Sequence, residues 1–357
     1  MNSNFWKNRK VFITGHTGFK GGWLSLWLLS LGAKVYGYSL APPLTEPSFF
    51  LETKLSNKIK ISTIGDILDL KKLSKTMNAI KPSVVIHLAA QPLVLKSYKD
   101  PIQTYKTNVL GTVNVLEAIR KVKTVKAFIN VTSDKCYKNY DWVWPYREND
   151  TLGGNDPYSS SKACSEIITN AYVKSYFSDN KLKVATARAG NVLGGGDWSM
   201  DRLVPDFFRA FKKDTILKIR YPNAIRPWQH VLEPLHGYLV LAEQLTLKKK
   251  YLFEGWNFGP NEKDNKSVLW IIEYLSKKTH HSRFKIEKNT REPEANLLKL
   301  DSSKSRVKLG WDNFWDIETS LDKTSEWYLA WLNKKNMYEI SLAQIDQFSK
   351  DIKKIKK

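Results

Sequence analysis

The stretch VTSDKCY places a hydroxyl, a carboxyl and an amine on three adjacent residues, Ser133, Asp134 and Lys135. It directly follows the apolar run AFIN, so the three side chains stand where a buried strand would end. A carboxyl that a dry site keeps protonated can give a proton to a leaving group, and a neighbouring amine can take a proton if its pKa is lowered. The stretch therefore indicates acid–base chemistry.

A second stretch, YSSSK, combines a phenol and an amine. Tyr158 and Lys162 are four residues apart, so a helix would place them on one face. A free tyrosine has a pKa of about 10, and a nearby cation favours the charged form of the phenol. Lys162 could therefore help Tyr158 to act as a base.

Three glycines near the N-terminus, in VFITGHTGFKGGW, mark a turn that could bind phosphate. Gly15, Gly18 and Gly21 lie three residues apart, between an apolar strand and the helical stretch WLSLWLLSLG. Glycines at such a turn let the backbone approach a pyrophosphate, and the helix N-terminus offers free N–H groups. At the first strand-to-helix turn of an alternating pattern, this triplet indicates a dinucleotide site.

The first half of the chain alternates strands with helices. The expected strands are apolar throughout, which is typical of a parallel sheet covered on both faces. They span residues 11–14, 34–38, 58–62, 83–90, 125–133 and 183–190, and the expected helices include 69–80, a long amphipathic stretch at 101–121 and one that begins near Tyr158. We predict an α/β fold, a Rossmann-like doubly wound parallel sheet with a smaller, interleaved α/β substrate-binding lobe.

The second half has loops rich in Gly, Pro, Trp and Arg, such as GGGDW and NAIRPWQHV, between shorter elements. We assign residues 1–187 and 228–255 to the dinucleotide-binding domain, and residues 188–227 and 256–332 to the substrate lobe. Residues 333–357 are expected to form a basic C-terminal helix or tail.

Composition argues against several classes of protein. The chain has 357 residues, of which 42% are hydrophobic and 26% charged, without a run of about 18 apolar residues that could span a membrane. The basic N-terminus does not have the pattern of a secretory signal. Two cysteines and six histidines show neither a disulfide framework nor a metal motif, so we expect no metal and a reducing, cytoplasmic location.

The formal net charge is +22. Three interpretations compete: a solvated lysine-rich surface, attraction of an anionic small substrate, and binding of nucleic acid. Lysines are spread along the chain, only the tail KDIKKIKK forms a dense run, and no nucleic-acid motif is recognised. This distribution favours the solvated surface, and we expect no nucleic-acid partner.

The glycine spacing GxxGxxG resembles that of the extended short-chain dehydrogenase/reductase superfamily. The resemblance implies an NAD site made of Gly15, Thr17, Gly18, Phe19, Gly21, Asp66, Ile67, Leu88, Ala89, Ala90, Asn108, Tyr158 and Lys162. Ser39 stands where the family carries an aspartate for the adenosine ribose. No arginine near that strand end could hold a 2′-phosphate, which favours NAD over NADP.

The residues that follow Ser133 distinguish groups within this superfamily. Epimerases carry small, inert side chains there, whereas sugar-nucleotide 4,6-dehydratases carry an acid and a base. Asp134 followed by Lys135, where the dTDP-glucose enzymes have glutamate, resembles the CDP-glucose 4,6-dehydratases. Further stretches that fit this family are TGHTGFKGGWLSLWL, TSDKCYKN, YRENDTLGGNDPYSSSKACSE, ARAGNVLGGGDW, NAIRPWQHVLEPL and EANLLKLDSSKSRVKLGW.

The resemblance implies a dehydration that is redox-neutral overall. Tyr158 would remove the proton of the sugar C4 hydroxyl while hydride passes to NAD⁺, and Ser133 would hydrogen-bond the same oxygen. The C4 ketone would acidify the C5 hydrogen, so that a base could remove the C5 proton while Asp134 protonates the departing C6 hydroxyl. Hydride would then return to C6. CDP-D-glucose would become CDP-4-dehydro-6-deoxy-D-glucose, a step toward 3,6-dideoxyhexoses of O-antigen-type polysaccharides.

Two roles stay open for Lys135. As the C5 base it needs a pKa several units below the ordinary value of about 10.4, which burial, Lys162 and a positively charged cofactor could provide. Alternatively it stays protonated and stabilises the enolate oxygen, while another group takes the proton.

A further set of residues is expected to bind the substrate. A guanidinium holds phosphate oxygens bidentately, so Arg226 is the best candidate to clamp the diphosphate, and Trp228 could stack on cytosine or line the sugar pocket. The full set is Gln91, Asn191, Arg202, Arg226, Trp228 and His230. Lys304 is expected either to tie the C-terminal segment to the substrate lobe or to be a plain surface residue.

Other functions remain as alternatives. They are another dehydratase or a 4-epimerase acting on GDP-mannose, dTDP-glucose or a UDP-sugar, and a non-catalytic dinucleotide-binding protein. The pair Asp134 and Lys135 argues against an epimerase, and the presence of Ser133, Tyr158 and Lys162 together argues against a non-catalytic scaffold. The resemblance also implies a homodimer, formed through helices on one face of the sheet.

Overall fold

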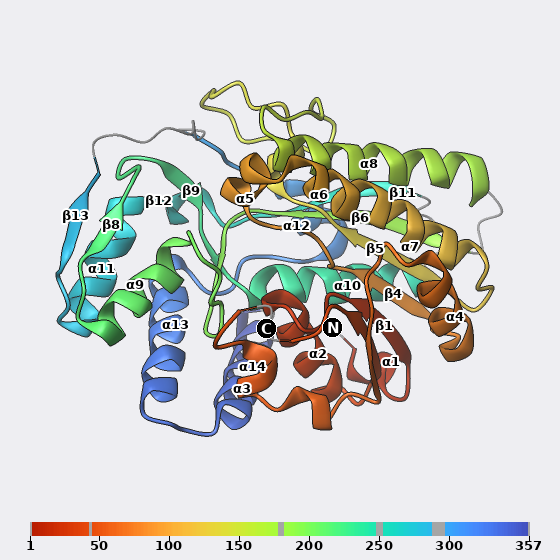
Figure 1. The fold of residues 1–357 in the computed structure, drawn as a ribbon, viewed down its shortest axis with the longest axis horizontal. Helices are drawn as coiled ribbons and strands as arrows, with labels where there is room; N and C mark the ends of the chain where they lie inside the picture. The colour runs from red at the N-terminus through yellow and green to blue at the C-terminus, as the bar shows by residue number, and fades with distance from the viewer. Residues whose placement is uncertain (1, 43–44, 178–181, 248–252, 288–296, 356–357) are drawn as a thin grey trace.

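The computed structural model describes residues 2–42, 45–177, 182–247, 253–287 and 297–355. At its centre is a sheet in the order β11-β6-β5-β4-β1-β2-β3, in which every neighbouring pair is parallel (Figure 1). Its strands are β1 (Lys10–Thr14), β2 (Lys34–Ser39), β3 (Ile61–Ile64), β4 (Val84–His87), β5 (Ala127–Val131), β6 (Lys183–Ala189) and β11 (Phe253–Phe258).

Successive residues of these strands enter two separate cores, one on each face of the sheet. In β1, Val11 and Ile13 belong to one core and Phe12 belongs to the other. Two helices cover the first face, α2 (Phe19–Ser30) and α10 (Leu232–Leu247), and three cover the second, α4 (Leu70–Ile80), α7 (Gly111–Arg120) and α8 (Pro157–Tyr176). Both sides of each strand are therefore buried, which explains the consecutive apolar residues. The predicted doubly wound sheet is confirmed.

The third strand starts later than expected. Residues 55–57 form the 3₁₀ turn η1 (Leu55–Asn57), and only β3 reaches the sheet beside β2. Because β3 lies at the edge of the sheet, Ile61 and Ile64 are exposed, which blurs the apolar signal of a strand there.

The long helix expected at 101–121 is divided into three parts. A π-helical turn, η2 (Lys106–Leu110), separates α6 (Pro101–Tyr105) from α7. Single π-turns inside helices are frequent at functional sites, and this one carries the buried Asn108.

The second lobe lies beyond the carboxyl ends of the strands, at the left of Figure 1. It contains three two-stranded pairings, β7 with β10, β9 with β12 and β8 with β13. Its elements are β7 (Val192–Leu193), α9 (Leu203–Lys213), β8 (Leu217–Ile219), β9 (Ile225–Pro227), β10 (Gln229–His230), η4 (Glu262–Asp264), β12 (Asn265–Ser267), α11 (Val268–Thr279) and β13 (Phe284–Ile286). The smaller α/β lobe is thus present, while the domain boundaries stay a prediction. Residues 248–252 and 294–296, which belong to predicted segments, lie outside the described residues.

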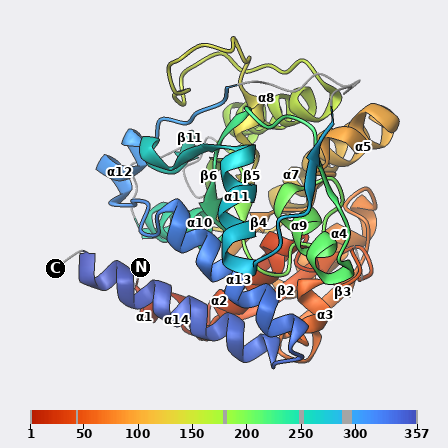
Figure 2. The same cartoon turned by 90° about the vertical axis from the view of Figure 1, so that its left-hand side faces the viewer.

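The last described helix packs on the first half of the chain (Figure 2). In α14 (Met337–Ile355) the ring of Phe348 contacts the rings of Trp27 in α2 and of Trp315, with centroids 5.6 and 4.9 Å apart. The remaining helices and turns are α1 (Ser3–Trp6), α3 (Phe49–Glu52), α5 (Val94–Lys99), η3 (Asp134–Cys136), α12 (Ser303–Leu309) and α13 (Ile317–Leu332). Residues 356–357 of the predicted tail lie outside the described part. In the described ranges, every helix is too short or too polar to cross a membrane.

Candidate active site

The glycine turn between β1 and α2 leaves the backbone open to a close ligand. Gly15 has a φ of +78°, in the left-handed region, and a Cβ on it would lie 2.8 Å from the backbone nitrogen of Ala89. A Cβ on Gly21 would lie 2.1 Å from the backbone oxygen of Gly15. Gly18 is the N-cap of α2, directly before Phe19, and offers no capping side chain. The N–H groups of the first turn are therefore available to an anion.

The residues expected around the adenosine half follow β2 and β3. The hydroxyl oxygens of Thr17 and Ser39 are 2.7 Å apart, so the residue at the usual aspartate position bonds within the turn. The carboxylate of Asp66 accepts from the backbone N–H of Leu68 at 2.9 Å, and Ile67 is buried. This end of the sheet carries no carboxylate at the Ser39 position.

Asn108 fixes the loop that follows β4. Its Oδ1 accepts from the backbone N–H of Gln91 at 2.8 Å, and its Nδ2 donates to the backbone oxygen of Gln91 at 3.1 Å and to the Ser161 hydroxyl at 2.9 Å. Upstream, the hydroxyl of Thr14 accepts from the backbone N–H groups of residues 88–89 at 3.2 and 3.3 Å. The loop is thus rigidly attached to both β1 and α8.

Gln91 does not line the substrate cavity described below. Its Nε2 donates to the backbone oxygen of Leu93 and to the hydroxyl of Thr104, both at 3.0 Å, and its Oε1 accepts from the Leu93 N–H at 2.7 Å. Both ends of the amide are therefore used inside its own loop. We revise the expectation that Gln91 binds substrate: it shapes the loop at 92–95, which does line the cavity.

The acid–base residues stand where β5 passes into the turn η3. The Ser133 hydroxyl accepts from the N–H of Lys135 at 3.1 Å and donates to Asp134 Oδ1 at 2.9 Å. Asp134 is buried, and its Oδ2 has no hydrogen-bond partner among the residues that the structure describes. Burial raises the pKa of this carboxyl despite the adjacent Lys135. A carboxyl with a raised pKa and an unused oxygen is suited to hold and donate a proton.

Tyr158 and Lys162 are both buried in the first two turns of α8. Burial raises the pKa of Tyr158 to about 12, against the effect of its hydrogen bond with Ser133. Burial lowers the pKa of Lys162 to about 8, and its Nζ donates to the backbone oxygen of Val131 at 3.3 Å. The phenol is therefore protonated at neutral pH, and a further positive charge beside it is needed to make it a base.

A buried ion pair lies beneath the catalytic turn and was missed from the sequence. Arg188 Nε and Nη2 donate to the two carboxylate oxygens of Glu166 at 2.9 and 2.8 Å. The same carboxylate accepts from the hydroxyls of Thr132 at 2.5 Å and Thr186 at 2.6 Å. Because Thr132 directly precedes Ser133, the pair anchors the strand end that carries the acid. Its partners are 22 residues apart on different elements, so no local motif reveals them.

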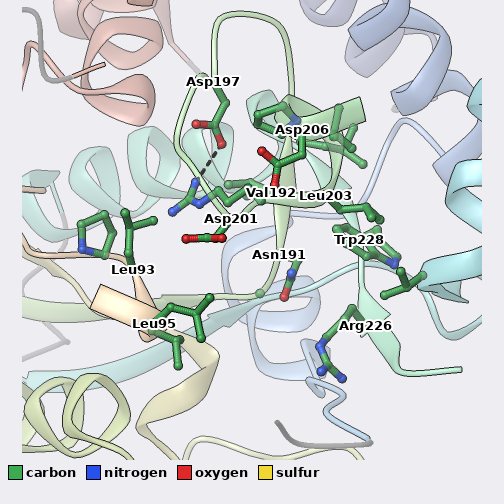
Figure 3. Close-up of a pocket in the computed structure, with 18 of the residues that line it drawn as sticks. Leu93, Leu95, Asn191, Val192, Asp197, Asp201, Leu203, Asp206, Arg226 and Trp228 are labelled. Carbon is green, nitrogen blue, oxygen red and sulfur yellow. Dashed lines mark hydrogen bonds and ion pairs between the residues drawn. The ribbon is translucent and has the colours of Figure 1, made fainter. Parts of the chain in front are cut away.

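A cavity of about 520 Å³ joins the catalytic turn to the second lobe. Its size is that of a small-molecule site. Figure 3 shows Leu93 and Leu95 on one side, Arg226 and Trp228 on the other, and Asn191 between them. The predicted residues that line it are Ser133, Asp134, Lys135, Tyr158, Asn191, Arg202, Arg226 and Trp228.

Two of these residues are held by short contacts. Arg202 Nη1 lies 2.8 Å from Asp197 Oδ2, drawn as a dashed line in Figure 3. Burial lowers the pKa of Arg202, but Asp197 outweighs this effect, and the pKa is raised overall. The Nε1 of Trp228 donates to a backbone oxygen at 2.9 Å, which fixes its ring, and Arg226 is buried beside it. In the described part of the chain, no three His, Cys, Asp or Glu side chains group as a metal site.

Two predicted roles are corrected by the structure. His230 lies in the core: its ring packs edge-on against Trp23 and Trp315, with centroids 6.1 and 5.0 Å apart, and it does not line the cavity. The expectation that His230 binds substrate is therefore wrong, because the chain turns inward after Trp228. The expected tie of Lys304 to the substrate lobe is wrong as well, since its Nζ lies 2.7 Å from Glu254 Oε2 and attaches α12 to the sheet strand β11.

Lys20, the second residue of α2, lines the same cavity and was not singled out from the sequence. The glycine spacing alone gives no role to the residues between the glycines. A charged side chain between Gly18 and Gly21 was the available signal.

Comparison with known proteins gives the family. The family model described as GDP-mannose 4,6 dehydratase matches residues 12–324. The chain belongs to this family. The CDP-glucose 4,6-dehydratase of Salmonella typhimurium is 46% identical over 98% of this chain and 98% of that protein. The dTDP-glucose 4,6-dehydratase of Xanthomonas campestris pv. campestris is 25% identical over 89% of this chain and 92% of that protein. The resemblance to the CDP-glucose 4,6-dehydratases is confirmed.

Solved structures of this dehydratase and epimerase group share the fold. A dTDP-glucose 4,6-dehydratase from Bacillus anthracis, in complex with NAD, has a TM-score of 0.76 at 22% identity and covers 90% of this chain and 96% of that one. A UDP-glucose 4-epimerase from Thermotoga maritima, with UDP-glucose, has a TM-score of 0.79 at 23% identity and covers 90% and 99%. Both the dehydratase and the epimerase reaction are thus found on this architecture.

Proposed function

We propose that this chain is an NAD-dependent hydro-lyase that converts CDP-D-glucose to CDP-4-dehydro-6-deoxy-D-glucose. The observation that carries the proposal is Asp134, a buried carboxyl with an unused oxygen, beside Ser133 and Tyr158 in one cavity. An epimerase expels no hydroxyl and has no need of such an acid. The 46% identity to a CDP-glucose 4,6-dehydratase supports the sugar nucleotide.

The glycine turn supports NAD as the cofactor. Neither Gly15 nor Gly21 has room for a Cβ, as the close approach of a pyrophosphate requires. The residues that would hold NAD are Gly15, Thr17, Gly18, Phe19 and Gly21 at the pyrophosphate, Asp66 and Ile67 at the adenine, and Leu88, Ala89, Ala90, Asn108, Tyr158 and Lys162 toward the reacting end. When bound, NAD accepts a hydride from the sugar and returns it later in the reaction.

Tyr158 takes the proton of the sugar C4 hydroxyl in this proposal. Its raised pKa means that the phenol must first be acidified. The ammonium of Lys162, one helical turn along α8, and positive charge on a bound ligand both act in that direction. Ser133, which hydrogen-bonds Tyr158 and Asp134, holds the C4 oxygen between the base and the acid.

Asp134 gives its proton to the C6 hydroxyl as water departs. Burial raises the pKa of this carboxyl and so favours its protonated form, and Oδ2 is the oxygen left without a partner in the described structure. Lys135, the next residue, also lines the cavity. In this proposal it takes the C5 proton. The acid and the base thus come from one turn, which fixes their separation.

The test is to incubate the purified protein with CDP-, dTDP-, GDP- and UDP-hexoses and to measure the absorbance of the 4-keto product after base treatment. We expect turnover of CDP-glucose, and preference for a dTDP or GDP sugar would refute the substrate. Asp134→Asn should abolish turnover. It should also raise stability at neutral pH, because the carboxyl's raised pKa shows that the fold disfavours its charged form.

We further infer a cytoplasmic homodimer. Large apolar side chains are exposed on neighbouring helices of one face of the sheet, at Ile102 in α6, Leu110 in η2 and Ile167 in α8. Large exposed apolar side chains on adjacent helices support a surface that a partner covers. Sedimentation should give a dimer, and Ile167→Glu should shift it toward the monomer; a monomeric wild type would contradict the inference.

A further inference from the structure

We infer that Lys20, a cation at the wall of the catalytic cavity, binds the diphosphate group of a nucleotide ligand. The inference rests on the proposed function, because it assumes that the cavity takes a dinucleotide and a sugar nucleotide. Lys20 lies at the cavity wall, in the first turn of α2 and next to the glycine turn.

The other basic side chains of the cavity are largely engaged. Arg202 pairs with Asp197 at 2.8 Å. A lysine within β8 and an arginine directly after it also face carboxylates. Those pairs are Lys218 with Glu287 at 3.4 Å and Arg220 with Asp201 at 3.8 Å. Lys135 and Arg226 have interactions of their own as well. Within the described ranges, the ammonium of Lys20, in contrast, makes no hydrogen bond or ion pair, and the carboxylates of Asp134 and Asp197 act on it only electrostatically.

Asp134 does not serve as the missing partner of Lys20. The two groups influence each other electrostatically, but their charged atoms form no ion pair. An ion pair with Asp134 therefore does not explain the position of the Lys20 side chain. An ordinary surface lysine would extend into solvent, whereas this side chain is partly buried at the cavity wall.

The surroundings of Lys20 favour an anionic ligand. Burial lowers its pKa to about 8, and the positive charges of Arg202 and Lys162 add to this effect. Asp134 and Asp197 act in the opposite direction, but Asp197 is already paired with Arg202. A further anion beside Lys20 would therefore be attracted. A diphosphate offers several charged oxygens to an ammonium, and the free N–H groups at the start of α2 favour the same ligand.

Two ligands of the proposed reaction carry this group: the pyrophosphate of the dinucleotide and the diphosphate of the sugar nucleotide. ADP-ribose and CDP represent them separately. Their dissociation constants can be measured by calorimetry for the wild type and for Lys20→Gln, Lys20→Arg and Lys34→Gln. Lys34 is an exposed lysine at the start of β2, so Lys34→Gln makes the same change in net charge away from the cavity.

We expect Lys20→Gln to weaken one of the two ligands about ten- to hundredfold, the range for a hydrogen bond to a charged group, and Lys20→Arg to retain most of the affinity. Loss of ADP-ribose alone identifies the dinucleotide as the source, and loss of CDP alone identifies the sugar nucleotide. Unchanged affinity for both, or an equal loss in Lys34→Gln, overturns the inference. A wild type that binds neither ligand refutes the proposed function instead. Circular dichroism of each variant verifies that it is folded.

Discussion

Replacing Arg188 with methionine should destabilise the protein strongly. The side chains of Arg188 and Glu166 are 5% and 1% exposed, so the loss leaves a carboxylate buried without its counter-ion. Two N–H groups of Arg188 and two threonine hydroxyls donate hydrogen bonds to the Glu166 carboxylate, and only the hydroxyls of Thr132 and Thr186 would remain. Breaking a buried pair from one side typically costs about 3–5 kcal/mol. We expect the free energy of unfolding to fall by about that amount.

Urea denaturation followed by tryptophan fluorescence measures this loss. Arg188→Met combined with Glu166→Gln should recover much of it, because no unpaired charge stays buried. Arg120→Met is the matched control: it breaks a surface pair with Glu117, in which Arg120 is 43% exposed, and should cost much less stability. Equal losses for Arg188→Met and Arg120→Met, or no recovery in the double variant, would refute the reasoning.

Three further predictions concern the cofactor turn, the core and the base. Gly21→Ala should abolish ADP-ribose binding, because its Cβ would lie 2.1 Å from a backbone oxygen. Gly310→Ala is the control: it strains the left-handed C-cap of α12, where φ is +62°, but its Cβ meets nothing within 4 Å, and calorimetric binding should stay intact. Burial lowers the pKa of His230 to about 3, so the unfolded chain takes up a proton that the folded chain does not as the pH drops below the ordinary value of about 6.5. The free energy of unfolding should therefore fall toward acid pH. Measured by urea denaturation, His230→Phe should lose about 2 kcal/mol less of this free energy than the wild type between pH 7.5 and pH 5. Lys135→Ala should retain C4 oxidation but lose exchange of the C5 hydrogen with deuterated solvent; unchanged exchange by mass spectrometry would exclude Lys135 as the base.

Residues whose role depends on local geometry could be predicted from the sequence. Gly15 and Gly21 sit at a strand-to-helix turn because of their spacing, and Tyr158 and Lys162 share a helix for the same reason. Asp134 follows a buried strand, and that position alone predicts a dry environment for its carboxyl. In each case a few neighbouring residues determine the outcome.

Residues whose role depends on tertiary direction could not be predicted. His230 is two residues from Trp228, yet the chain turns between them and sends the imidazole into the core. Gln91 follows a strand end that suits a ligand, but the backbone of its own loop satisfies its amide. Lys20 lies between two glycines of the phosphate-binding turn, and the spacing of those glycines does not indicate whether its side chain faces the cavity or the solvent.

The contact between Trp27 and Phe348 has a consequence for biosynthesis. Helix α2, which opens the dinucleotide half, is made early, but the ring that covers Trp27 leaves the ribosome only with α14. Until then the side of α2 that carries Trp27 lacks the Phe348 ring, and chaperones can bind this apolar surface of the nascent chain. A message truncated after α13 would yield a product with that surface bare, and cellular proteases should remove it quickly.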